Sequence, residues 1–85
     1  LENEIGLEAM RRKDYPEAVR HFQSAIDLDA RAVPAYLNLG DLRVEQGKDD
    51  EALNTWNTLV RVAPDRAYLA FDRLDTLAKR AGTPE

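Results

Sequence analysis

The fold is decided by residues 36–64, YLNLGDLRVEQGKDDEALNTWNTLVRVAP, because their pattern of small and bulky residues occurs a second time in the chain. An offset of 34 residues relates four pairs of matched positions: Gly6 and Gly40, Ala18 and Ala52, Phe22 and Trp56, Ala30 and Pro64. Repeats of this length are typical of helical units that cannot bury an apolar face alone and therefore stack on their neighbours. The sequence thus predicts stacked, similar units.

Apolar residues recur every three or four positions along the chain, which predicts helices rather than strands. The pattern divides into five helical segments, at roughly residues 2–12, 16–30, 33–47, 50–62 and 66–81. Asp14 and Glu17 have the spacing of a capping box, and Pro16 fits a first helical turn. Gly47 is expected to end the third helix. The chain is therefore predicted to be all-α.

The last segment departs from the repeat. Its expected apolar stripe consists of Ala67, Phe71, Leu74, Ala78 and Ala81. The position 34 residues after Gly40 is Leu74, so the small residue that allows close helix crossing is missing there. We therefore expect this helix to pack in a different register from the other first helices.

Composition and charge restrict the classes of function. The 85 residues form one domain at most, and 12 Lys and Arg against 16 Asp and Glu give a formal net charge of −4. An acidic surface disfavours nucleic acid, whose phosphates require clustered basic side chains. There is no cysteine and no long apolar run, so neither a thiolate metal site nor direct membrane contact is expected. The sequence has no nucleophile–base pair, phosphate-binding glycine loop or metal-ligand cluster, so we expect no enzymatic activity and no cofactor.

The chain resembles the tetratricopeptide repeat family, whose pattern is W-x2-L-G-x2-Y, then A-x3-F, then P. The resemblance is carried by Gly6, Ala18 and Phe22 in the first unit and by Leu39, Gly40, Ala52, Trp56 and Pro64 in the second. It implies an α–α superhelix with antiparallel helix pairs at about residues 1–30 and 31–64. Residues 65–82 would be a capping helix or the first helix of a third repeat. The first helices would line a concave groove that binds a peptide or a partner helix.

Nine residues are expected to face this groove by match to the family pattern: Asn3, Leu7, Met10, Arg11, Leu37, Asn38, Asp41, Val44 and Glu45. The four apolar side chains are candidates for an exposed strip, in which Met10 would add adaptability. The alternative is that they cover one another or pack on the last helix. Asp41 and Glu45 fit a solvated helix face as well.

One subset of the family holds a C-terminal carboxylate with a clamp of Lys, Asn, Asn, Lys and Arg. The corresponding positions are Asn3, Leu7 and Asn38, then Tyr68 and Asp72, or Leu69 and Arg73 if the register slips by one. The positive charge that such a clamp needs is missing, so chaperone-tail binding is not expected. His21 is interpreted as an exposed surface side chain and Trp56 as a core aromatic.

Residues 39–64 and 67–85 also resemble one bacterial branch of the family, the lipopolysaccharide assembly proteins B. This likeness implies a protein-binding part that faces the cytoplasm in a membrane-anchored protein. The first residue is Leu1 rather than Met, which suggests a piece of a longer chain.

A structural role is the alternative to peptide binding. In this role, the two exposed ends of the repeat stack would pack on further repeats or on another copy. These ends are the free side of the first helix and the side that carries Tyr68 and Leu69.

Overall fold

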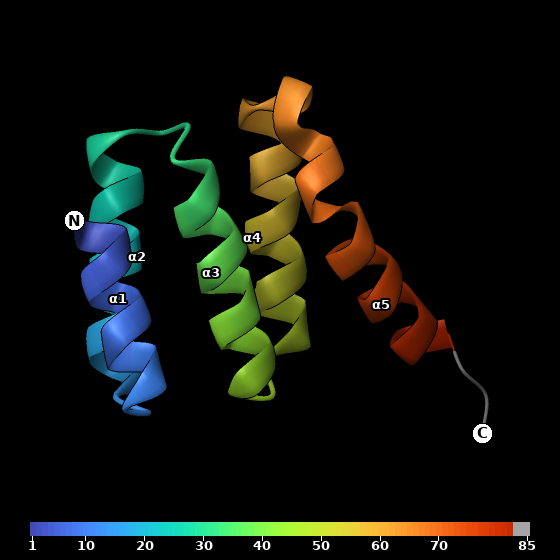
Figure 1. Cartoon of the computed structure of the whole chain (residues 1–85). Helices are drawn as coiled ribbons and strands as arrows, with labels where there is room; N and C mark the ends of the chain where they lie inside the picture. The colour runs from blue at the N-terminus through green and yellow to red at the C-terminus, as the bar shows by residue number, and fades with distance from the viewer. Residues whose placement is uncertain (83–85) are drawn as a thin grey trace.

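The computed structural model describes residues 1–82 and is helical over most of them. Along the chain it contains α1 (Glu2–Arg11), α2 (Tyr15–Leu28), α3 (Val33–Glu45), α4 (Asp49–Val62), the 3-10 segment η1 (Pro64–Ala70) and α5 (Phe71–Gly82). As Figure 1 shows, α1 pairs with α2 and α3 pairs with α4, and α2 also packs on α3. The result is a slab of 40 × 30 × 14 Å. The predicted all-α architecture, two antiparallel pairs followed by a fifth helix, is confirmed.

An aromatic side chain lying on a glycine holds each helix pair together. Phe22 is fully buried against Gly6, and Trp56 is buried against Gly40. A Cβ atom at Gly6 would lie 2.6 Å from the Phe22 ring, and one at Gly40 would overlap the Trp56 indole. Because interiors are close-packed, neither ring could keep its place beside a larger residue. The 34-residue repeat is therefore the recurrence of one packing arrangement, with Trp56 in the core as predicted.

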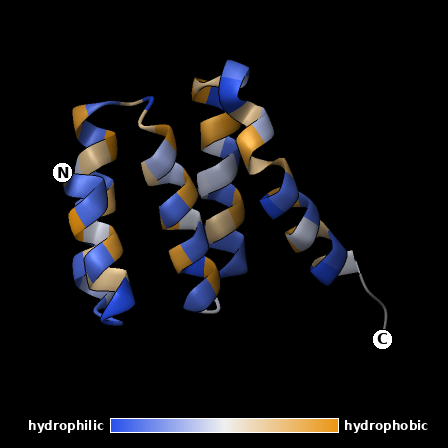
Figure 2. Ribbon diagram, in the orientation of Figure 1, coloured by the Kyte–Doolittle hydropathy of each residue, from blue (hydrophilic) through white to orange (hydrophobic). Residues whose placement is uncertain are grey.

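The core consists of two clusters, one centred on each helix pair. The first cluster contains Ala9, Ala18, Phe22, Leu39 and Leu42. The second contains Val33, Tyr36, Ala52, Trp56, Leu59, Ala63, Ala70 and Leu77. Ile26 of α2 packs against both clusters and so connects them. Hydrophobic and hydrophilic residues alternate along the helices in Figure 2, as expected when each helix buries one face.

The turns between helices follow the sequence signals in part. Pro16 lies in the first turn of α2, and Gly47, with φ of 76°, follows α3 as predicted. The predicted capping box is wrong, because the Asp14 side chain caps no backbone N–H group. Glu17 instead forms an ion pair with Arg20 and a hydrogen bond with His21.

The last helix differs from its predicted stripe. Phe71, Ala78 and Ala81 are exposed, whereas Leu77, which lay outside the stripe, is buried. The physical reason is η1: a 3-10 helix turns about 20° further per residue than an α-helix, so it rotates the helix that follows. The expected change of register is therefore present. The predicted stripe is wrong at Phe71, Ala78 and Ala81, whereas Ala67 is buried and Leu74 packs against the second core cluster.

Candidate binding groove

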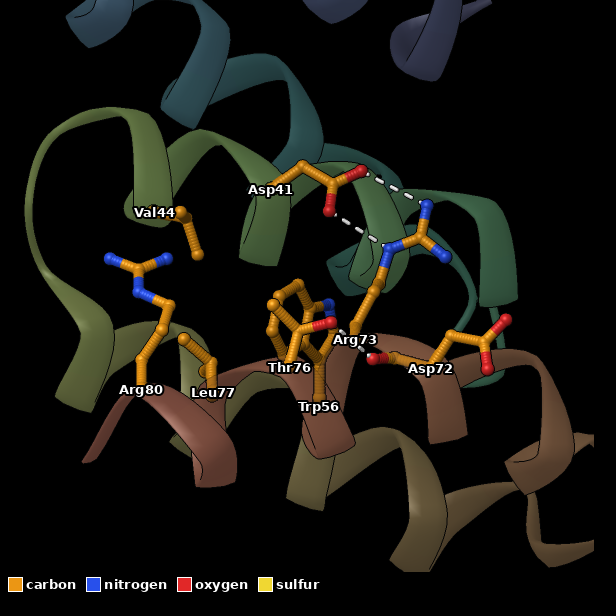
Figure 3. A pocket seen from close by; sticks show the side chains of 8 residues that line it. All are labelled: Asp41, Val44, Trp56, Asp72, Arg73, Thr76, Leu77 and Arg80. Atoms are coloured by element: carbon orange, nitrogen blue, oxygen red, sulfur yellow. Dashed lines mark hydrogen bonds and ion pairs between the residues drawn. The ribbon is translucent and has the colours of Figure 1, made fainter. Parts of the chain in front are cut away.

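Two cavities open along α3 and together form the candidate groove. One lies between α3 and α5, has a volume of about 250 Å³ and is lined by Asp41, Val44, Trp56, Asp72, Arg73, Thr76, Leu77 and Arg80 (Figure 3). The other lies between α1 and α3, has a volume of about 410 Å³ and is lined by Leu7, Met10, Arg11, Lys13 and Glu45. Most of both linings comes from α1, α3 and α5.

The structure places the nine expected groove residues close to one another. Six of them line the two cavities: Leu7, Met10, Arg11, Asp41, Val44 and Glu45. Asn38 donates a hydrogen bond of 2.9 Å to Asn3, which joins α3 to α1 beside the groove. Leu37 lines neither cavity and packs against the second core cluster.

The apolar groove residues are half-buried rather than fully exposed. Leu7 and Met10 pack against the first core cluster, and Leu37 and Val44 pack against the second. Their partial burial is close to the alternative interpretation, in which the four apolar side chains are covered by neighbouring residues. They form an apolar floor that is anchored in the core, and the charged side chains form its rim.

An ion pair between Arg73 and Asp41 crosses the groove from α5 to α3. Arg73 Nε donates to Asp41 Oδ1 at 2.8 Å and Nη2 donates to Oδ2 at 3.0 Å, as the dashed lines in Figure 3 mark. Both side chains are about one-third exposed. The hydrogen bonds to Asp41 raise the pKa of Arg73 above its usual value. A bidentate pair of this kind fixes orientation as well as charge.

The contribution of α5 to the groove was not fully predicted from the sequence. Adding 34 to the α3 groove positions selects a single residue of that lining, Asp72. Adding 35 to Asn38, Asp41 and Glu45 gives Arg73, Thr76 and Arg80, which all line it. To predict which α5 residues line the cavity, one would have needed the size of the register change. Leu74 at the glycine position showed only that a change occurs.

The other arginines of the groove also have acidic partners. Arg11 Nη2 lies 2.7 Å from Glu8 Oε1, and Arg80 Nη2 lies 3.0 Å from Asp49 Oδ2. At the α1 end, the Tyr15 hydroxyl donates to Glu45 at 3.1 Å. A charged ligand would therefore have to compete with pairs that already exist.

The comparison with known proteins explains this arrangement. The sequence profile of the tetratricopeptide repeat family matches residues 9–74. The chain belongs to the tetratricopeptide repeat family. It is 34% identical over 68 residues to the small glutamine-rich tetratricopeptide repeat-containing protein 2 of Saccharomyces cerevisiae, covering 80% of this chain and 20% of that protein. It is 33% identical over 54 residues to the STIP1 homologue of Dictyostelium discoideum, covering 64% of this chain and 10% of that protein.

The chain thus spans a fifth or less of these two relatives. No solved structure matches it at the level of significance that the relatives reach. The likeness to the lipopolysaccharide assembly proteins B stays a prediction.

The tetratricopeptide repeat clamp is represented by Asn38 and Arg73. Arg73 is one of the two positions selected by the slipped register, and it does lie in the groove, where Asp41 neutralises it. Its companion position is Leu69, which is half-buried against the core. Asn3 and Leu69 stand where the clamp has its two lysines, and Leu7 stands where it has its first asparagine, so the clamp is incomplete.

His21 lies away from the groove and was wrongly interpreted as an exposed side chain. Only 16% of its side chain is exposed, because it is inserted between α1 and α2. Nδ1 lies 2.6 Å from Glu2 Oε1, and Nε2 lies 3.0 Å from Glu17 Oε2. The hydrogen bond to Glu2, and then that to Glu17, raise the pKa of His21 despite partial burial and nearby Arg20. The imidazole therefore ties the two helices together.

Residues 1–82 contain no cluster of three or more His, Cys, Asp or Glu side chains arranged to bind a metal ion. Within the same residues, no helix combines the length and the apolarity needed to cross a bilayer.

Proposed function

We propose that this chain is a protein-interaction scaffold that binds a peptide or a short helix in the groove of α1, α3 and α5. The observation that carries the proposal is the pair of cavities that both take lining residues from α3, each with apolar and charged side chains in its lining. Membership of the tetratricopeptide repeat family supports it, since helical repeats of this type use their concave face for binding. The scaffold binds without catalysing a reaction and acts in the cytoplasm.

The groove favours a ligand with apolar anchors. Met10 and Val44 are accessible at the two cavities, whereas the arginines are occupied by Glu8, Asp41 and Asp49. Buried apolar contacts usually provide most of the affinity of an interface, and charges mainly select among partners. We therefore expect ligands that combine two apolar side chains with few charges.

The proposal is tested with peptides selected from a phage-displayed random library on the purified chain. Thr76 is exposed and lines the α3–α5 cavity, so Thr76→Arg fills the groove without disturbing the core. Asn54→Arg adds the same side chain on an exposed face of α4 and is the matched control. We expect Thr76→Arg to weaken peptide binding at least about tenfold and Asn54→Arg to leave it unchanged.

Isothermal titration calorimetry measures both affinities, and circular dichroism checks that both variants keep their helices. Selected peptides that bind Thr76→Arg as tightly as the parent chain would contradict the groove as the binding site.

A further inference from the structure

A second apolar surface lies between α4 and α5, and its cavity shares only Leu77 and Arg80 with the lining of the candidate groove. It contains the largest cavity described, of about 540 Å³, lined by Asp49, Asp50, Leu53, Asn57, Leu74, Leu77, Ala78, Arg80 and Ala81. Figure 1 shows α5 leaning away from α4 towards the C-terminal end of α5, and residues 74–81 of this helix contribute to the lining of the cavity. Leu53 is 40% exposed and Phe71 is 56% exposed beside it. We call this surface, Leu53 with Phe71, Leu74, Ala78 and Ala81, the α5 surface.

The α5 surface lacks the partner that the preceding repeat has. In the second pair, α4 covers α3 and places Trp56 on Gly40. No described helix covers α5 in the same way, so Phe71, Ala78 and Ala81 remain exposed, while Leu74 is half-buried against the second core cluster.

The order of residues along α5 identifies what fits this surface. Phe71, Leu74, Ala78 and Ala81 share one helical stripe, and the bulky residues precede the small ones. The charges are also unevenly divided: the first half carries Asp72, Arg73 and Asp75, a net charge of −1, and the second half carries Lys79 and Arg80, a net charge of +2. A helix of this kind is complementary in both size and charge to a copy of itself that runs in the opposite direction.

We infer that a second copy of this chain covers the α5 surface, with the two α5 helices antiparallel about a two-fold axis. In this arrangement Phe71 of each copy lies opposite Ala81 of the other, and Leu74 lies opposite Ala78. The cavity, whose lining includes Leu53, Ala78 and Ala81, receives the aromatic ring of the second copy. Each contact occurs twice, as a two-fold interface requires.

The charges on one flank of α5 support the antiparallel direction. Lys79 Nζ lies 3.0 Å from Asp75 Oδ2 within one copy. The antiparallel arrangement brings Asp75 of the second copy next to the same Lys79, so two pairs merge into a network of four alternating charges. A parallel arrangement would instead bring like charges together, which is unfavourable.

Sedimentation velocity of the whole chain, from about 1 µM to about 1 mM, tests the inference. We expect a monomer–dimer equilibrium that Phe71→Ser shifts to monomer, because Phe71 is exposed and contributes to no core cluster. Leu28→Ser is the matched control, since Leu28 is 79% exposed on α2 and lies outside the α5 surface. A chain that is monomeric throughout, or a dimer that Phe71→Ser leaves intact, would overturn the inference.

A charge exchange then tests the antiparallel direction. Asp75→Lys and Lys79→Asp should each weaken the dimer about three- to tenfold, because each places like charges across the axis. The double variant, Asp75→Lys with Lys79→Asp, restores alternating charges and should recover most of the parental dimer constant. A double variant as weak as the weaker single variant would rule out this pairing. The Thr76→Arg change, on the groove side of α5, should leave the dimer constant unchanged.

Discussion

Lys13 and Gly47 follow the first helix of each repeat, at positions 34 residues apart. Both have left-handed backbones, with φ of 64° at Lys13 and 76° at Gly47. Glycine adopts this conformation without steric cost, whereas a residue with a Cβ atom does so at a cost of about 1 kcal/mol. The first repeat therefore carries local strain that the second one avoids.

Lys13→Gly should stabilise the chain by about 0.5–1 kcal/mol because it removes this strain. The reverse comparison is Gly47→Ala, which should destabilise by a similar amount even though a Cβ atom there would meet nothing within 4 Å. Urea unfolding followed by circular dichroism measures both changes. Equal stability of Lys13→Gly and the parent chain would show that the strain is relieved in another way.

His21 gives the stability a pH dependence whose sign is defined by its partners. Its pKa in the folded chain is raised above the ordinary value of 6.5, chiefly by Glu2. The stabilisation is therefore fully present below about pH 6.5 and is lost as the pH rises through the folded pKa. The pKa of Glu17 is lowered, chiefly by its hydrogen bond to His21, so this partner stays ionised in mildly acidic solution.

We expect the loss of stability on His21→Gln to be larger at about pH 5.5 than at about pH 8.5. Thermal unfolding of both chains at the two pH values measures this difference. The same loss at both values would mean that the imidazole acts only through packing.

Trp56 was predictable because its glycine partner recurs at a fixed offset, whereas the contact of His21 with Glu2 joins two helices and has no repeated counterpart.

At the scale of the elements, α5 shows what the sequence could and could not predict. The five helices followed from apolar periodicity, and Leu74 at the glycine position correctly indicated a change of register. The 3-10 geometry of η1 could not be read from PDRAYLA, since these residues are equally compatible with an α-helix. For this reason the sequence offered groove positions on α1 and α3, which remain predictions, and none on α5.

The small number of buried residues in α5 predicts that this helix opens locally more easily than α3. Leu77 is its only buried residue, whereas α3 buries six. Local opening costs least where few apolar contacts are lost, so α5 amides should exchange with deuterium at least about tenfold faster than those of α3. Native-state hydrogen exchange by NMR at low protein concentration measures this. Equal protection in both helices would contradict it, and protection of α5 that grows with concentration would agree with the inferred dimer.

At the scale of the whole molecule, the two core clusters are joined by α3, which contributes Tyr36 to one and Leu39 to the other, and by contacts between the repeats. Ile26 packs against both clusters from α2, and Arg31 and Asp65 form a further link between the turns that end the two repeats. In repeat proteins, stability is roughly the sum of each repeat and its interface with the next. Weakening the interface should therefore separate the two transitions.

Ile26→Ala should destabilise the chain by about 1–3 kcal/mol and reduce its cooperativity. Trp56 is the single tryptophan and reports on the second cluster, whereas circular dichroism reports on all helices. We expect the two unfolding curves to coincide in the parent chain and to diverge in Ile26→Ala, with Leu28→Ala as the exposed control. Coincident curves in Ile26→Ala would show that other contacts suffice for coupling.

The rotation introduced by η1 has a consequence for recognition. Between α3 and α5, equivalent groove positions are 35 residues apart, although the repeat itself advances by 34. A partner whose own side chains are evenly spaced would fall out of phase on passing from one of these helices to the other. In the proposed binding mode, the groove would therefore favour partners whose apolar anchors are unevenly spaced, and adding identical repeats in series would not simply lengthen the motif that binds.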